Sequence, residues 1–245
     1  MELLFGATTV FFLKNNIKPW IEKILLGFAA GVMMAASVWS LLMPAINMAE
    51  ESGKIAWLSP TLGFLAGIIF LIFIDFFLSK VNKRNKEDVN NKTKKIKMLV
   101  LAVTLHNIPE GMAVGVIFAG AMYGSTGITM AGAIALAIGI SIQNFPEGAI
   151  VSMPLKSNGM SKFQSFFVGM LSGIVEPIGA IITLLLTNMV LPILPFILSF
   201  AAGAMIYVIV EELIPEANDE NYYKLGIIGV AIGFSIMMIL DVALG

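Results

Sequence analysis

The chain has 245 residues, of which 58% are hydrophobic and 13% charged, with a formal net charge of −1 and a mean hydropathy of +0.91. This composition excludes an ordinary soluble domain, in which about a quarter of the residues are charged. The chain has no cysteine, which excludes disulfides and thiolate metal sites. We therefore expect a polytopic membrane protein.

Long apolar runs predict an all-α fold. About 20 apolar residues cross roughly 30 Å of hydrocarbon as a helix, and no stretch alternates with the period of a barrel strand. The first run has only about 11 residues, so either this helix is partial or it begins before the first residue. We expect a single transmembrane domain over residues 1–245, with eight helices at about 3–13, 25–46, 58–78, 98–122, 128–155, 163–186, 195–214 and 225–244.

The basic residues are concentrated on one side of this topology. If both termini lie outside, 14 of the 15 lysines and arginines fall in the connections after the first, third, fifth and seventh spans. Eight of them lie in the polar segment 80–97, and Lys54 alone lies on the other side. Since basic loops remain in the cytoplasm, we expect a plasma-membrane or inner-membrane protein with outside N- and C-termini and a cytoplasmic loop at 80–97.

A six-residue motif occurs twice within apolar runs, at residues 106–111 (HNIPEG) and, 37 residues later, at 143–148 (QNFPEG). Side chains three and four residues apart project from one face of a helix. The two spans run in opposite directions, so we expect a pseudo-twofold axis in the membrane plane and an ion site on helices interrupted at the prolines. The polar side chains on these two faces are His106, Asn107, Glu110, Gln143, Asn144 and Glu147.

Glu176, next to Pro177, is a third carboxylate at the depth of Glu110 and Glu147. Any one of them alone could be a structural residue bonded to a neighbouring helix. Three ionised carboxylates at one depth, with no Lys or Arg there, must be neutralised by protons or by a cation. His106, the only histidine, adds a nitrogen, and this donor set suits a borderline divalent ion such as Zn²⁺, Fe²⁺, Mn²⁺ or Cd²⁺.

These features leave three classes of function open. The first is a divalent-metal transporter, which we favour, and the second is a proton-coupled carrier of an organic solute that uses the glutamates as proton relays. A receptor or scaffold with a structural metal is the third. The H-E-x-x-H motif of a metalloprotease is absent, so we expect no enzyme, no catalytic residues and no catalytic cofactor. We expect metal ions and the lipid bilayer as partners, and no nucleic acid.

The motifs at 106–111, 143–148, 175–177 (VEP) and 211–216 (EELIPE), in this order over eight spans, resemble the ZIP (Zrt/Irt-like) metal transporters, in particular their bacterial GufA-like branch. The resemblance extends from about Phe5 to Gly245. It implies a 3+2+3 arrangement in which the first three spans are related to the last three by inversion. It also implies transport of metal towards the cytoplasm through a binuclear site, and a homodimer.

The resemblance also implies particular site residues. One metal position would be formed by His106, Glu110, Gln143, Glu147 and Met33, and a second by Asn107, Asn144 and Glu176, with Glu110 and Glu147 bridging. The outer entrance would lie near Ser40, Asn47 and Asp241, and the cytoplasmic exit near Asp75, Glu211 and Glu212. This chain has Gln143 where many members have histidine, and segment 80–97 lacks the histidine-rich loop of many members.

Overall fold

The computed structural model describes residues 2–12, 18–53, 55–84, 91–125, 128–157, 159–218 and 222–244, and the described backbone is helical apart from short turns. This confirms the expected all-α membrane bundle. The elements in chain order are α1 (Glu2–Ala7), α2 (Thr9–Phe12), α3 (Pro19–Ala36), the π-helix η1 (Ser37–Leu42), α4 (Met43–Glu51), α5 (Leu58–Arg84), α6 (Asn91–Met122), α7 (Met130–Ser157), α8 (Lys162–Gly173), α9 (Val175–Leu185), α10 (Thr187–Val190), the 3₁₀ turn η2 (Leu191–Ile193), α11 (Leu194–Val208), the π-helix η3 (Ile209–Leu213), α12 (Ile214–Ala217) and α13 (Tyr223–Leu244).

Six helical segments in the described part of the chain are long and apolar enough to cross a membrane. Within α6, the segment Glu110–Met122 is apolar but shorter than these six. The count of eight spans therefore stays a prediction. The six segments are Pro19–Glu51, Leu58–Phe77, Met130–Met153, Lys162–Leu185, Thr187–Ala217 and Lys224–Ala243.

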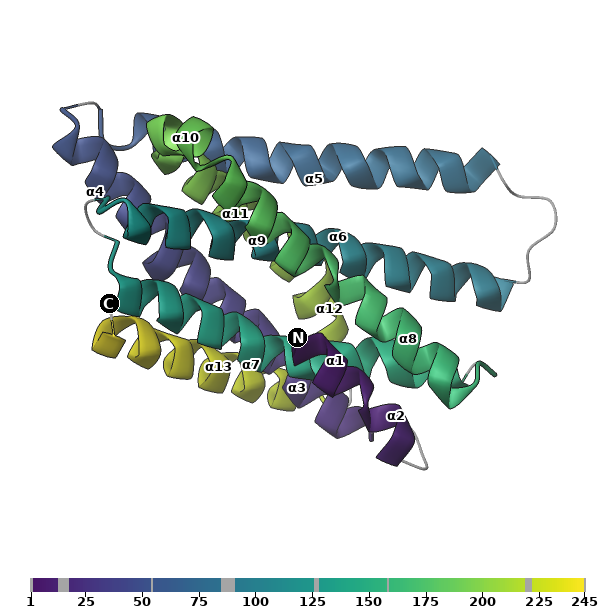
Figure 1. Cartoon of the computed structure of the whole chain (residues 1–245). Helices are drawn as coiled ribbons and strands as arrows, with labels where there is room; N and C mark the ends of the chain where they lie inside the picture. The colour runs from purple at the N-terminus through teal and green to yellow at the C-terminus, as the bar shows by residue number, and fades with distance from the viewer. Residues whose placement is uncertain are drawn as a thin grey trace.

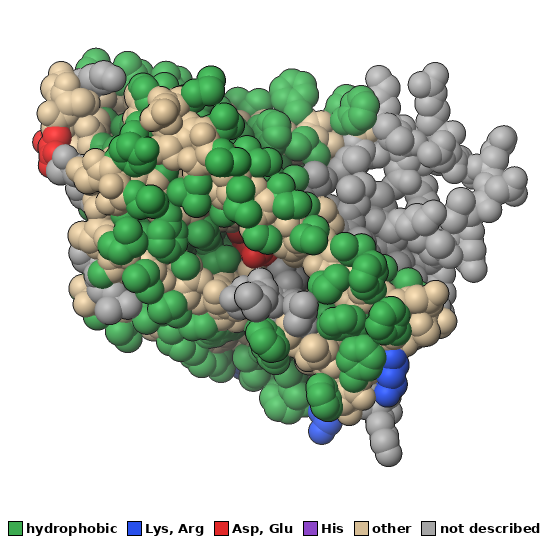
Figure 2. All heavy atoms as spheres, viewed as in Figure 1, with side chains coloured by type: hydrophobic (Ala, Val, Ile, Leu, Met, Phe, Trp, Pro, Cys, Tyr) green, Lys and Arg blue, Asp and Glu red, His purple; other side chains and the backbone are tan. Residues whose placement is uncertain are grey.

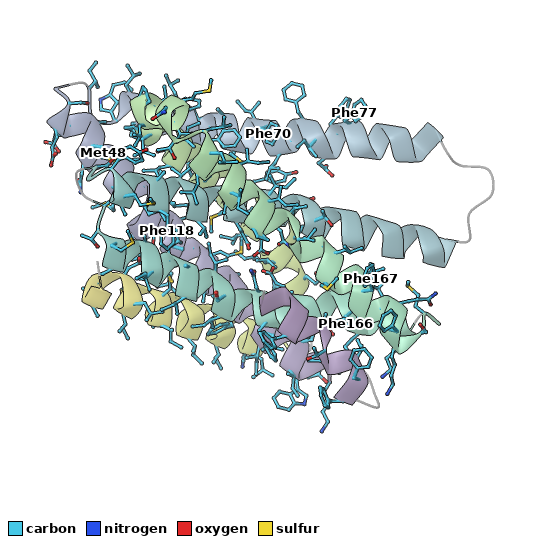
Figure 3. The ribbon with its side chains drawn as sticks, viewed as in Figure 1. Met48, Phe70, Phe77, Phe118, Phe166 and Phe167 are labelled. Carbon is cyan, nitrogen blue, oxygen red and sulfur yellow. The ribbon has the colours of Figure 1, made fainter. Side chains whose placement is uncertain are left out.

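The spans form an inner and an outer group. The segments built on α3, α7 and α11 are 67%, 60% and 56% buried, whereas those of α5, α8–α9 and α13 are only 22–28% buried. Helices α5 and α13 lie along opposite edges of the bundle (Figure 1). On α5, Phe70 packs against Phe200 with ring centroids 5.5 Å apart, while Phe77 points away from the bundle (Figure 3). The outer helices therefore present apolar side chains to the bilayer.

Both motif helices continue through their prolines. Helix α6 is unbroken from Asn91 to Met122 and α7 from Met130 to Ser157, so the expectation of helices interrupted at the motifs is wrong. A proline removes one backbone hydrogen bond, which a membrane helix tolerates when its neighbours pack against it. The irregular turns are instead η1 and η3, which are followed by Pro44 and Pro215.

Close backbone contacts join each outer edge helix to an inner helix. A Cβ placed on Gly67 of α5 would overlap the carbonyl oxygen of Phe200 on α11. A Cβ placed on Gly233 of α13 would likewise overlap the carbonyl oxygen of Phe28 on α3. Small residues at such crossings allow membrane helices to approach closely without a hydrophobic driving force. The inner helix of the first pair, α11, packs against α6, and both helices of the second pair pack against α7. Helices α6 and α7 carry the motifs.

Candidate metal site

Five polar side chains of the motif region are buried inside the bundle. Asn107 and Glu110 come from α6, Asn144 and Glu147 from α7, and Glu176 from α9. The first three are fully buried, and Glu147 and Glu176 are 8% and 9% exposed. In each motif the amide and the carboxylate are three residues apart, which places them on one helix face as the sequence predicts.

Two hydrogen bonds tie the motif amides to the α8–α9 segment. The Asn144 Nδ2 donates to Glu176 Oε2 at 2.7 Å, and the Asn107 Nδ2 donates to the carbonyl oxygen of Ser172 at 2.9 Å. The amide oxygens Oδ1 of Asn107 and Asn144 are buried and accept no hydrogen bond from the described residues. A buried oxygen without a donor is costly, and a cation is one partner that could satisfy it.

Glu147 interacts electrostatically with two other carboxylates. The charges of Glu176 on α9 and of Glu212 in η3 both act on Glu147. No three acidic or histidine side chains within the described part of the chain are placed to hold one ion. Oxygen donors of the amides would therefore have to contribute to any cation site built on these residues.

Three predicted ligands lack a described contact with this cluster. The side chains of His106 and Gln143 lie outside the described residues. Met33 is 1% exposed and belongs to the apolar core on α3, a helix that packs against α7. The roles of these three residues stay predictions.

The glycine that ends each motif lies where a neighbouring helix touches the motif helix. A Cβ added to Gly111 would lie 2.6 Å from the Cα of Glu176, so α9 crosses α6 in backbone contact at this point. The Cα of Gly148 would be 3.0 Å from a Cβ added to Gly6 on α1. A larger residue at Gly111 would displace the backbone that carries Glu176.

The predicted entrance residues lie together near one end of the bundle. The hydroxyl of Ser40 donates to Asp241 Oδ1, which joins η1 to α13. Both residues line a cavity of about 180 Å³ together with Asn47. The cavity also contains Thr129, which the sequence analysis missed. Its Oγ1 accepts a hydrogen bond from the Gly132 backbone N–H at 2.9 Å, so a T-x-x-G helix start was the available signal.

The predicted exit residues share one neighbour. Tyr207 of α11 interacts electrostatically with Asp75 of α5 and with Glu211 and Glu212 of η3. Asp75 and Glu211 are exposed, and Glu212 is half-buried. Tyr207 was also missed, because a single tyrosine in an apolar run gives no specific sequence signal.

A lysine links two helices beside this acidic group. Lys23 Nζ of α3 donates to the carbonyl oxygen of Glu216 at 2.6 Å, at the end of α12. The side chain of Glu216 also interacts electrostatically with Lys23, Glu22 and Glu212. Lysine commonly pairs with the exposed carbonyls of a helix C-terminus.

The fold and this cluster define a multi-pass membrane protein with an acid–amide site buried between its helices. The chain belongs to the ZIP zinc transporter family, whose family model matches residues 96–241. It is 35% identical to the zinc transporter ZIP11 of Xenopus tropicalis, over 98% of this chain and 93% of the relative. The zinc transporter GufA of Myxococcus xanthus is also 35% identical, over 89% and 85%. The zinc transporter ZIPB of Bordetella bronchiseptica is 34% identical, over 91% and 72%.

Membership of this family confirms the resemblance to its bacterial GufA-like members. The chain is a transporter rather than an enzyme, and its function is divalent metal transport. Zinc is accordingly a substrate and not a catalytic cofactor.

Proposed function

We propose that the chain moves zinc and related divalent ions, such as iron, manganese and cadmium, into the cytoplasm through a binuclear site at mid-membrane. The observation that carries this proposal is the burial of two amides and three carboxylates on three adjoining helices. A buried carboxylate is expensive in a bilayer unless a cation or a proton compensates it. Two amide oxygens that accept no hydrogen bond from the described residues add acceptors at the same place.

The two metal positions share their carboxylates. In the proposal, Glu110 and Glu147 bridge the positions, as the family resemblance implies. The second position is completed by Asn107, Asn144 and Glu176, all of which are buried. The first is completed by His106, Gln143 and Met33.

The proposed route runs from the Ser40–Asp241 cavity to the acidic group around Tyr207. Glu212 supports this route, because its charge acts on Glu147 of the motif region and also on Tyr207. Acidic groups between the site and the exit would lower the barrier for a departing cation. Polar side chains line the Ser40–Asp241 cavity and acidic side chains surround Tyr207, which supports a route with acceptors at both of its ends.

The proposed inverted repeat is supported by matching spacings in two outer helices. Asp75 follows Gly67 by eight residues on α5, and Asp241 follows Gly233 by eight residues on α13. Each glycine meets a backbone carbonyl of its inner helix. With the basic connections on the cytoplasmic side, we further propose outside termini, a bacterial-type inner-membrane or plasma-membrane location, and a homodimer.

Zinc uptake into proteoliposomes tests the proposal. Wild-type protein should load the vesicles with zinc, whereas Glu147→Ala and the nearly isosteric Glu147→Gln should not. Glu50→Ala provides the control, since Glu50 is an exposed acidic residue on α4. Full uptake by both Glu147 variants would contradict the site, and uptake of an organic solute without zinc would favour the proton-coupled carrier.

A further inference from the structure

The span built on α11 ends in two short elements. The π-helix η3 has five residues, and α12 (Ile214–Ala217) has four, with Pro215 in its first turn. Helices kink at π-helical turns and at prolines, and the last carbonyl groups of a helix have no partner within it. Contacts with other helices must therefore fix the direction in which α12 leaves η3.

Two contacts hold the last residues of α12. The Nζ of Lys23 on α3 donates to the carbonyl oxygen of Glu216 at 2.6 Å. The next carbonyl, that of Ala217, lies against α13, because a Cβ placed on Gly226 would be 2.5 Å from its oxygen. The first contact is made by a side chain, so a single substitution removes it without changing the backbone.

The packing of α12 against α13 is incomplete. A cavity of about 260 Å³ lies between them, lined on α12 by Ile214 and Ala217 and on α13 by Gly226, Ile227 and Val230. Side chains that border a cavity have fewer contact atoms to restrain them. The bond from Lys23 therefore matters more to the position of α12 than it would in a closely packed segment.

Lys23 is bound within the protein at a boundary where lysines commonly extend outwards. Figure 2 shows a mainly hydrophobic face with blue lysine side chains near its lower right edge. Lys18, at the start of α3, is exposed, as expected for a lysine that reaches water or lipid head groups. Lys23, five residues later, is half-buried and bonded to another helix. Its bond is to a backbone oxygen, so it does not depend on the side chain at position 216.

Fixing α12 also fixes the acidic residues that precede it. Glu212 of η3 lies four residues before Glu216, and α3 packs against both η3 and α12. The charge of Glu212 acts on Glu147 of the motif region and on Tyr207 at the proposed exit. A change in the direction of α12 would therefore move a carboxylate whose charge reaches both places.

We propose that Lys23 is a positioning residue for metal release: its bond to the Glu216 carbonyl holds α12 against α3 and keeps Glu212 in place at the cytoplasmic exit. The first part, the restraint on α12, depends only on the contacts of α12. The second part, the effect on release, rests on the proposed function, in which Glu212 belongs to the exit. Each part has its own measurement.

The position of α12 is measured in metal-free proteoliposomes by double electron–electron resonance. Because the chain has no cysteine, spin labels can be placed at Asn218→Cys, after α12, and at Ser235→Cys, an exposed position on α13. Lys23→Met should widen the distance distribution at least about twofold, because the kink at η3 is then less restrained. Lys23→Arg, which can still donate to a carbonyl, and Lys18→Met should leave it narrow. An equally narrow distribution in Lys23→Met would overturn the positioning role.

Release is measured by zinc uptake. Lys23→Met should lower the maximal rate about fivefold, a typical effect of one lost hydrogen bond, and leave the apparent KM for zinc unchanged, because zinc enters at the other end. Lys23→Arg should retain most of the rate. Lys18→Met, which removes an equal charge from α3, and Glu216→Gln, which keeps the carbonyl acceptor, should match the wild-type protein.

The matched variants separate the alternatives. An equal loss in Lys18→Met would assign the effect to charge alone, and a loss in Glu216→Gln would assign it to the carboxylate; either result would overturn the proposal. Full uptake by Lys23→Met with a widened distance distribution would overturn the role in release. A wild-type protein that transports no zinc, with α12 still loosened in Lys23→Met, would contradict the proposed function and leave the restraint on α12 supported.

Discussion

Asn144 on α7 donates a hydrogen bond of 2.7 Å to Glu176 on α9, and thereby connects the second motif to a carboxylate 32 residues away. Its counterpart in the first motif, Asn107, donates to the backbone carbonyl of Ser172 on α8 instead. The two motifs, which are alike in sequence, are therefore hydrogen-bonded to nearby positions of the α8–α9 segment. The second motif orients an acidic side chain through Asn144, so Asn144 and Glu176 should act as a unit.

Replacing Asn144 by alanine should weaken zinc transport. The change removes a donor to a buried carboxylate, and hydrogen bonds to charged groups contribute about 1.5–3 kcal/mol, or roughly 10- to 100-fold in affinity. We expect initial uptake at low zinc concentration to fall by that factor. Asn188→Ala, at an exposed asparagine on α10, is the matched control. Equal uptake in the two variants would show that the Asn144 bond is dispensable.

Replacing Gly111 by alanine should lower both activity and stability. A Cβ there would lie 2.6 Å from the Cα of Glu176, so α9 must move away from α6. We expect a loss of zinc uptake and a lower Tm. Gly179→Ala is the control on the same helix pair, since the nearest atom to its Cβ would be the Met112 backbone nitrogen at an ordinary 3.4 Å. Similar effects of the two substitutions would argue against a specific contact at Gly111.

Replacing His106 by alanine should change metal preference more than it changes folding. His106 is the only histidine of the chain, so its loss removes the only imidazole ligand from the proposed first position. Imidazole favours Zn²⁺ over Mn²⁺, and an oxygen-only site should shift towards harder ions. Competition between the two ions in an uptake assay measures this preference. An unchanged ratio would mean that His106 is structural.

Single cysteines can test the orientation, because the chain has none of its own. Glu50 and Lys224 are both exposed, and the basic-residue pattern places them on opposite sides of the membrane. In intact cells, a membrane-impermeant maleimide should label Glu50→Cys and not Lys224→Cys. Labelling of Lys224→Cys before permeabilisation, with protection of Glu50→Cys, would reverse the proposed direction of the termini.

Much of the helical fold could be predicted from apolar runs, because a bilayer leaves the backbone few alternatives to a helix. The burial of Asn107, Glu110, Asn144 and Glu147 followed from their spacing within the motifs. The family resemblance also anticipated the neighbourhood of Ser40 and Asp241, which the structure shows to be hydrogen-bonded.

The contacts between helices could not be predicted in the same way. The bond from Asn107 to the Ser172 carbonyl depends on where α8 crosses α6, and a backbone acceptor leaves no trace in residue identity. The continuity of α6 and α7 through their prolines also depends on packing. The π-helical turns η1 and η3 were also not predicted, because a one-residue insertion in a helix has no composition signature.

The most direct test of the account is a calorimetric titration of metal-free protein with zinc at neutral pH, in two buffers of different ionisation enthalpy. Carboxylates must be ionised and the imidazole neutral to bind metal, so protons should be released and affinity should fall as the pH is lowered. We predict about two zinc ions per chain in wild-type protein, an observed enthalpy that differs between the buffers, and loss of both ions in Glu110→Ala and Glu147→Ala. The same enthalpy in both buffers, together with unchanged stoichiometry in both variants, would contradict a metal site built on these carboxylates.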